Sequence, residues 1–188
     1  LHEAIIGAKD GVTHYFVARQ SDLGAWLEAR EGVFASGAVE QFQSVISGSA
    51  DILFNVGFNL IKSYNTDIKS RLRFINIASR AAFRGEQQDY ISYACSKGGI
   101  ISLTKTMSRS FGESDNVVAI SIAPGFVRTE MAQSFIDKHG EDSVKQGITL
   151  DRLTEPKDIS PIVSLIVSGK MDHSTGSTID VNGGSFLR

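Results

Sequence analysis

The sequence predicts a single α/β domain in which a doubly wound parallel sheet lies between two layers of helices, a three-layer α/β/α arrangement. Short apolar segments, such as residues 73–78 and 117–122, have the length and composition of strands that are buried on both faces. They alternate with segments of helical periodicity, which is typical of a parallel sheet covered by helices. Ligands of this fold class bind at the carboxyl ends of the strands, so the residues that follow the strands are the first candidates for a site.

The expected elements can be placed in chain order. Strands are expected at 4–6, 12–18, 50–53, 73–78, 117–122 and 177–181, and helices at 39–46, 55–69, 93–111 and 158–167. The helix at 93–111 has the strongest pattern, because its apolar residues recur at a spacing that places them on one face. These residues are Ile100, Leu103, Met107 and Phe111. The helix at 158–167 is expected to have a proline in its first turn, where proline is tolerated best.

The spacing of the elements departs from this pattern near the N-terminus. Only five residues separate Ile6 from Val12, whereas a parallel crossover needs ~10–12 residues or more. The segment 51–53 also continues into Phe54 without a strand-end loop. Either the domain is shortened or segments are missing near 12–13, 53–54 and 70–71. The second explanation is favoured, because loss of a crossover would expose the buried face of the sheet. We therefore expect one domain over residues 1–188.

The composition argues against several classes of function. Hydrophobic residues make up 41% and charged residues 21%, as in ordinary soluble domains. A net charge of −2 offers no basic surface for nucleic acid, and no apolar run approaches the ~18 residues of a membrane span. The single cysteine, Cys95, rules out a disulfide within the chain and fits a cytoplasmic location. The four histidines lack the spacing of metal ligands, so no metal site is expected.

Tyr93 and Lys97 form the first candidate for a catalytic pair. They are four residues apart at the start of the clearest helix and therefore share one face. A tyrosine free in water titrates near pH 10, so it transfers protons poorly at neutral pH. An ammonium group ~4–5 Å away would favour the phenolate by about 3–4 kcal/mol at an effective dielectric constant of about 20. By spacing alone, an exposed surface pair is the commoner alternative.

Polar residues follow two of the expected strands. Ser79 comes directly after the strand at 73–78, where its hydroxyl could bind a substrate oxygen or simply cap a turn. The segment 123–129, with the sequence APGFVRT, follows the strand at 117–122. Its Pro-Gly pair permits a sharp turn and a close approach of backbone to a ligand, although an ordinary strand-ending turn has the same sequence.

Four motifs together resemble the short-chain dehydrogenase/reductase family, and within it the 3-oxoacyl-acyl-carrier-protein reductases. They are NIAS at 76–79, YACSK at 93–97, PGFVRT at 124–129 and TGSTIDVNGG at 175–184. The resemblance is strong over residues 74–188 and patchy over residues 1–54. It implies a Rossmann-type fold and transfer of a hydride between an NAD(P) cofactor and a carbonyl or secondary alcohol. The implied partner is a small-molecule substrate.

The resemblance also implies roles for individual residues. Tyr93 would donate and accept the proton, Lys97 would bind the nicotinamide ribose and assist Tyr93, and Ser79 would hold the reacting oxygen. A helix-borne asparagine that supports a proton-relay water maps to Asn55, with Asn59 as a weaker second choice. The expected cofactor-binding residues in this half of the chain are Lys97, Pro124, Gly125, Val127 and Thr129.

The N-terminal cofactor motif is only partly present. Gly7 and Gly11 match the first two glycines of the family's phosphate-binding turn, but its final glycine is absent, as is the NNAG motif that follows the segment 51–53 in the family. At the end of the strand at 12–18 the chain has Arg19 rather than an acidic residue. An arginine there can pair with a 2′-phosphate, so NADP(H) is favoured over NAD(H).

Two further segments carry expectations of their own. Residues 130–150 mix apolar and charged positions and could form an amphipathic lid over the substrate or a plain pair of surface helices. The helix at 93–111 contains Gly98, Gly99 and other small residues, and the family resemblance implies that it belongs to a homodimer or homotetramer interface.

Two alternative functions remain open. The first is a catalytically inactive relative that binds nucleotide or a protein partner as a scaffold. The complete set of Ser79, Tyr93 and Lys97 argues against it, because a scaffold has no physical need for a lysine buried beside a tyrosine. A serine hydrolase is the weaker alternative, since the chain lacks a G-x-S-x-G motif.

Overall fold

A computed structural model describes residues 15–18 and 71–188 of the chain. Several of the expected features lie outside these residues: the strands at 4–6 and 50–53, the helices at 39–46 and 55–69, and the missing segments proposed near 12–13 and 53–54. The same is true of Gly7, Gly11, Arg19, Asn55 and Asn59.

The described strands form one parallel sheet with the order β1-β2-β3-β4. The strands are β1 (Tyr15–Ala18), β2 (Leu72–Ile77), β3 (Val117–Pro124) and β4 (Thr178–Val181). Each overlaps an expected strand. The ends of β2, β3 and β4 differ from the expected ends by at most two residues, because an apolar pattern marks the buried middle of a strand better than its ends.

The described helices lie between and after these strands. They are α3 (Ala81–Arg84), α4 (Ile91–Phe111), α5 (Glu130–His139), α6 (Glu141–Lys145) and α7 (Pro156–Val167), with 3-10 turns at Gln88–Tyr90 and Asp172–Ser174. The helix α7 begins two residues earlier than expected, since Pro156 occupies its first turn and the Asp158 carboxylate accepts the Glu155 N–H at 2.8 Å. None of the helices in these ranges combines the length and the apolarity needed to cross a bilayer.

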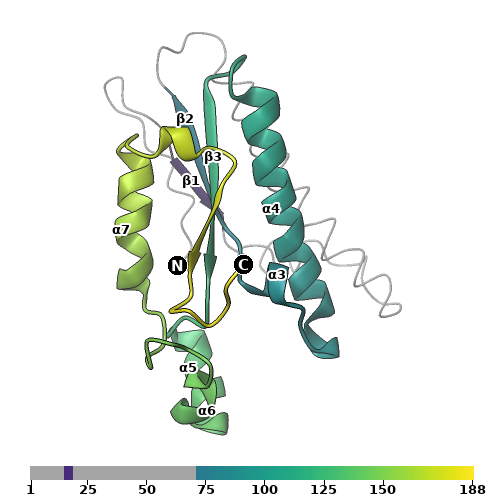
Figure 1. The fold of residues 1–188 in the computed structure, drawn as a ribbon, viewed down its shortest axis with the longest axis vertical. Helices are drawn as coiled ribbons and strands as arrows, with labels where there is room; N and C mark the ends of the chain where they lie inside the picture. Colours follow the sequence, from purple (N-terminus) through teal and green to yellow (C-terminus); the bar gives the residue numbers. More distant parts are fainter. Residues whose placement is uncertain (1–14, 19–70) are drawn as a thin grey trace, which may run out of the picture.

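Helices cover both faces of the sheet (Figure 1). On one face, Phe74 and Ala119 pack with the α4 residues Ile100 and Met107, and all four are at most 7% exposed. Leu103 and Phe111 complete that cluster, so the apolar face expected for α4 is confirmed. On the other face, the following residues of the same strands pack against α7. These are Ile75, Val118, Ile120 and Ile122, with Ile166 of α7. Because adjacent strand residues point to opposite faces, this double burial explains why β2 and β3 carry apolar residues on both faces.

Backbone hydrogen bonds hold the carboxyl ends of the strands together. Beyond the end of β2, the Ala78 N–H donates to the Ile122 carbonyl at 2.7 Å and the Arg80 N–H donates to the Pro124 carbonyl at 3.0 Å. The Gly125 N–H in turn donates to the Val181 carbonyl at 3.0 Å. The segments after β2 and β3 are thereby fixed side by side, with β4 next to them.

Residues 130–150 form a pair of short helices beyond the carboxyl ends of the strands (Figure 1). The helix α5 begins after Thr129, whose side-chain oxygen accepts the Ala132 N–H at 3.2 Å. Ile136, Ile148 and Leu153 bury one side of the pair in a small apolar cluster of their own. Of the two interpretations of this segment, the structure contains the helix pair.

Candidate active site

Lys97 lies in the second turn of α4 and is buried, with only 4% of its surface exposed. Its ammonium group donates a hydrogen bond of 2.9 Å to the carbonyl of Ile77, the last residue of β2. Burial disfavours the charged form and lowers the pKa of the Lys97 ammonium from 10.5 to about 8. This placement contradicts the alternative of an exposed surface pair.

Tyr93 lies one turn before Lys97 and is half-buried. The Lys97 Nζ atom is 5.8 Å from the centroid of the Tyr93 ring, so the two side chains share one face of α4 as their spacing predicts. The Ser96 hydroxyl donates to the Tyr93 carbonyl at 2.8 Å, which reinforces the turn that carries both residues.

Ser79 lies between the two hydrogen bonds that join the ends of β2 and β3, and it is 7% exposed. Its side-chain oxygen accepts the Ala81 N–H at 3.1 Å, so Ser79 does cap a turn. A hydroxyl that accepts through a lone pair can still donate its hydrogen, and the cap therefore leaves Ser79 able to bind a substrate oxygen. The Lys97 ammonium is hydrogen-bonded to the carbonyl of Ile77, which is two residues before Ser79 in the chain. The structure therefore brings the serine and the tyrosine–lysine pair to one edge of the sheet.

The segment after β3 packs tightly against the end of β4. A Cβ atom on Gly125 would lie 3.0 Å from the Asn182 Cα. Glycine is therefore needed here because the two backbone segments lie so close together, and not because of an unusual backbone angle. Val127 forms a parallel bridge to Thr154, and Thr129 is exposed at the start of α5. Of the expected cofactor-binding residues, Lys97, Pro124, Gly125, Val127 and Thr129 are therefore all within the described part of the chain.

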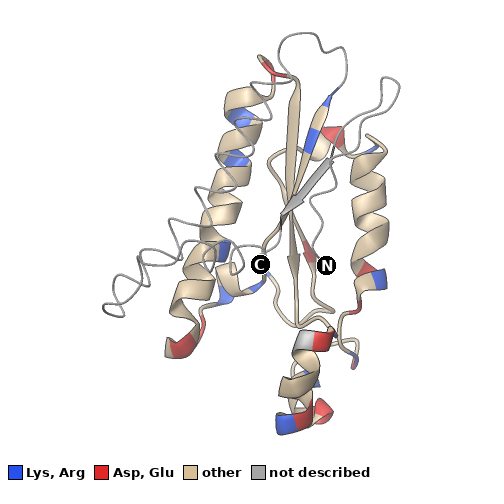
Figure 2. Ribbon diagram, turned by 180° about the vertical axis from the view of Figure 1, so that it is seen from behind, with Lys and Arg blue, Asp and Glu red and all other residues tan. Residues whose placement is uncertain are grey.

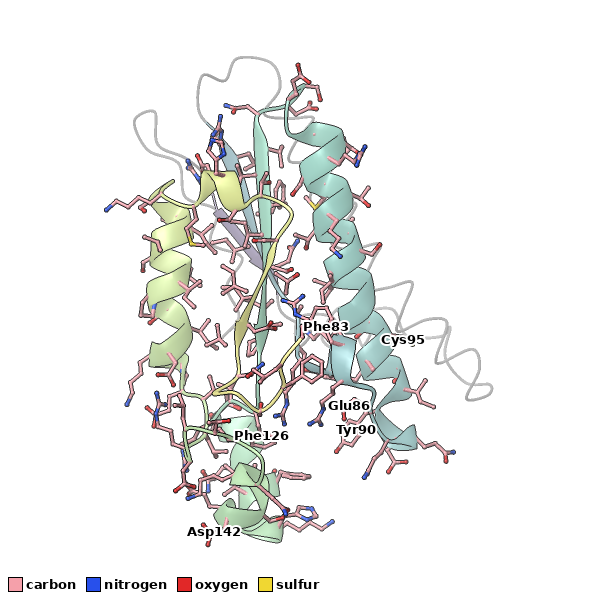
Figure 3. All side chains as sticks on the ribbon, in the orientation of Figure 1. Phe83, Glu86, Tyr90, Cys95, Phe126 and Asp142 are labelled. Carbon is pink, nitrogen blue, oxygen red and sulfur yellow. The ribbon has the colours of Figure 1, made fainter. Side chains whose placement is uncertain are left out.

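Sequence reasoning missed Arg80, which directly follows Ser79 at the same strand end. The sequence does contain a signal for Arg80, because ligands bind beyond the carboxyl ends of the strands and Arg80 is a polar residue at such an end, like Ser79. Its neighbour Arg84 pairs through two hydrogen bonds, of 2.6 and 2.9 Å, with Glu86, which lies at the same end of α4 as Tyr90 (Figure 3).

These side chains together can manage the proton at a carbonyl or hydroxyl oxygen. Tyr93 and Ser79 each provide a hydroxyl that can donate to such an oxygen, and a buried cation at Lys97 favours a negative charge that develops beside it. Lys97 uses one of its three N–H donors on Ile77. Within the described residues, the others are available to hydroxyl oxygens of a bound ligand.

Comparison with known proteins gives consistent matches. Residues 24–185 match the family model described as enoyl-(acyl carrier protein) reductase. The chain is 31% identical over 156 residues to a 3-oxoacyl-[acyl-carrier-protein] reductase of Chlamydia trachomatis, which covers 82% of this chain and 60% of that protein. It is 29% identical over 158 residues to an acetoacetyl-CoA reductase of Shinella zoogloeoides, which covers 84% of this chain and 64% of the relative. The chain thus spans less than two thirds of the length of either relative.

A solved structure shows the same fold. It is provisionally named a 2-deoxy-D-gluconate 3-dehydrogenase of Agrobacterium tumefaciens and contains bound NADP. The superposition has a TM-score of 0.69 at 22% identity and covers 82% of this chain and 61% of the other. The parallel sheet between two helical layers is therefore a Rossmann-type fold, as the sequence predicts.

Replacing Lys97 by methionine should stabilise the cofactor-free protein at neutral pH. The lowered pKa means that the Lys97 ammonium is disfavoured by about 3 kcal/mol in the folded state. Lys97→Met removes this cost but also loses the hydrogen bond to Ile77, so the free energy of unfolding should rise by about 1–2 kcal/mol. Between pH 8 and ~10.4 the unfolded lysine binds more protons than the folded one, so the wild type gains stability as pH rises. The advantage of the variant is therefore full below about pH 8 and shrinks above it.

Urea denaturation from pH 6.5 to 10 measures this difference. Lys105→Met, at an exposed lysine of the same helix, is the matched control and should leave the stability unchanged at each pH. A Lys97→Met protein that is less stable than the wild type by the same amount at every pH would contradict the assignment of a disfavoured buried charge.

Proposed function

The chain belongs to the short-chain dehydrogenase/reductase family, and we propose that it is an NAD(P)-dependent oxidoreductase acting on a carbonyl or secondary alcohol. The observation that carries this proposal is the buried Lys97, which is bound to the end of β2 and lies beside Tyr93. Lys97 has no acidic partner among the described residues. Burial of such a lysine is unfavourable, and it is retained most readily where the charge serves chemistry. The names of the reductases that the chain resembles support the same reaction class.

A nicotinamide cofactor fits the residues at this edge. The two N–H donors that Lys97 does not use on Ile77 match the hydroxyl oxygens of a ribose. On the β3 side, the cofactor would be lined by Pro124, Gly125, Val127 and Thr129. The turn at Gly125 is compact, because its backbone packs closely against Asn182. When bound, the cofactor supplies or accepts the hydride at the substrate carbon.

The residues of the chain would manage the oxygen and its proton. In the reducing direction, the Tyr93 hydroxyl gives its proton to the substrate oxygen while the bond between that oxygen and the carbon becomes single. The Ser79 hydroxyl donates a hydrogen bond to the same oxygen and holds it in place. The Lys97 ammonium stabilises the phenolate that remains on Tyr93. In the oxidising direction each proton moves the opposite way.

The finer assignments are part of the same proposal. We favour NADP(H) because Arg19 stands where an acidic residue would favour NAD(H), and Asn55 would support a proton-relay water. We propose a cytoplasmic homodimer or homotetramer. Among the described residues, a Cβ atom added at Gly98 or Gly99 would meet nothing within 4 Å, which supports a face of α4 that is open to a second copy.

The alternative of an inactive scaffold predicts a different result. A protein that only binds nucleotide would gain thermal stability from NADPH but would oxidise none of it in the presence of ketones. Thermal melting and NADPH consumption, measured on the same sample, separate the two functions.

Replacing Tyr93 by phenylalanine removes only the hydroxyl that transfers the proton. We expect kcat/KM for NADPH-dependent reduction of ethyl 3-oxobutanoate to fall ~10²–10⁴-fold, the usual contribution of a general acid. Tyr90→Phe is the matched control, because Tyr90 is 45% exposed and lies just before α4. It should keep wild-type activity. Equal activity of the Tyr93→Phe variant and the wild type would sink the tyrosine mechanism.

The cofactor preference can be tested at Arg19. Wild-type protein should have a lower KM for NADPH than for NADH, and Arg19→Ala should raise the KM for NADPH ~10–100-fold through loss of a charge-assisted hydrogen bond. The KM for NADH should change little. Arg109→Ala, in the exposed last turn of α4, is the control. A wild type that prefers NADH, or an Arg19→Ala variant with unchanged kinetics, would count against NADP(H).

A further inference from the structure

Arg80 is fixed at the same strand end as Ser79. Its N–H donates to the Pro124 carbonyl at 3.0 Å, and its own carbonyl accepts the N–H groups of Phe83 and Arg84 at 3.0 and 3.2 Å. Arg80 therefore begins α3 with a backbone that is tied to both β3 and the helix. The position of the Arg80 Cα atom, from which the side chain extends, is therefore fixed.

Arg80 differs from the other arginines around it, because it forms no ion pair with a residue that the structure describes. Arg84 is paired with Glu86, Arg128 with Glu141, and Arg188 with Asp180. Within the described residues, no ion pair or side-chain hydrogen bond joins Arg80 to a carboxylate. Figure 2 shows basic positions along α3 and the adjoining part of α4, beside the central strands.

The surroundings of Arg80 make its charge available to a ligand. The side chain is only partly exposed, and burial followed by the like charge of Arg84 lowers the pKa of Arg80. Glu86 and Tyr93 act in the opposite direction on this pKa. A guanidinium remains charged at any physiological pH. Arg80 is thus a partly desolvated cation at the strand end that also carries Ser79.

The short helix that follows Arg80 is held from two sides. Phe83 packs on the apolar cluster of β2, β3 and α4, and its ring stacks on Phe186 with centroids 6.4 Å apart. The Arg188 guanidinium covers the same ring at 4.2 Å. A charged group on such a fixed element loses less conformational freedom when a ligand binds.

We propose that Arg80 binds a carboxylate of the substrate and that this protein therefore acts on oxo acids or hydroxy acids. The proposal rests on the proposed function and names its substrate class. The planar guanidinium can hold a carboxylate through two parallel hydrogen bonds. Since Arg80 is next to Ser79, a substrate anchored there would present a nearby carbonyl oxygen to Ser79 and Tyr93.

The test compares acids with their neutral esters. The substrates are 3-oxobutanoate, 4-oxopentanoate and their methyl esters, each with saturating NADPH. Arg80→Met keeps the length of the side chain and removes its charge, Arg80→Lys keeps the charge, and Arg109→Met is the control at an exposed arginine of α4. Melting temperatures with NADP⁺ and each oxo acid, a pair that cannot react, provide a readout that does not depend on turnover.

We expect Arg80→Met to raise the KM for the preferred acid ~10–100-fold, the effect of one or two charge-assisted hydrogen bonds. The kcat and the KM for the matching ester should change less than ~3-fold, and Arg80→Lys should recover part of the loss. The acid should raise the melting temperature of the wild type and of Arg109→Met, but not that of Arg80→Met.

Other outcomes overturn the inference. If Arg80→Met weakens acid and ester equally, or if the wild type prefers the ester, Arg80 does not bind a carboxylate, while turnover of either substrate leaves the proposed function intact. If the wild type reduces neither substrate, the proposed function fails for this class. A thermal shift by the acid that depends on Arg80 would then still support an anion site, and its absence would overturn that too.

Discussion

The hydrogen bond from the Lys97 ammonium to the Ile77 carbonyl joins the two elements on which the proposed chemistry depends. Ile77 ends the strand that leads to Ser79, and Lys97 lies one turn after Tyr93 on α4. Lys97 is only 4% exposed, so loss of its hydrogen bond to Ile77 would leave a buried ammonium group without a partner, which is unfavourable. The bond therefore sets the position of α4 relative to the strand end, and with it the position of Tyr93 relative to Ser79.

The rest of the fold provides a rigid support for that contact. Both faces of β2 and β3 are packed, one against α4 and the other against α7. Inside the first of these layers, Asn76 and Thr104 are almost fully buried and satisfy each other through a hydrogen bond of 2.8 Å. A second polar contact thus links β2 with α4 at a fixed register. Buried polar pairs of this kind favour one arrangement of the two elements over others, since a slip would deprive the Asn76 amide of this acceptor.

The sequence predicts the relative placement of Tyr93 and Lys97 well, for physical reasons. Residues four apart on a helix must share a face, so Tyr93 and Lys97 could be paired without a structure. The parallel sheet follows from strands that carry apolar residues on both of their faces. The burial of Lys97 could not be predicted from spacing, because an exposed pair has the same pattern. Thr129 and Ser79 also turn out to cap local turns, and sequence alone could not separate that role from ligand binding.

Arg80 shows where such reasoning stops. Besides Arg80, the arginines in or near the loops at this end of the sheet include Arg84, Arg128, Arg152 and Arg188, and sequence alone does not say which of them are neutralised. The partner of Arg188 is eight residues away in β4 and that of Arg128 is thirteen away in α6. Only the folded chain distinguishes these paired cations from Arg80. The expectations for Gly7, Gly11, Arg19 and Asn55 lie outside the described residues and remain predictions.

The central claim is that Lys97 is a buried ammonium beside Tyr93, and NMR titration of the lysine side chains tests it most directly. Protein labelled with ¹⁵N at lysine Nζ would be titrated from pH 6 to 11, and the Lys97 signal identified by its absence in Lys97→Met. Burial of the Lys97 ammonium should make its signal titrate near pH 8. A Lys97 signal that titrates at ~10.4, as lysines do in water, would contradict it.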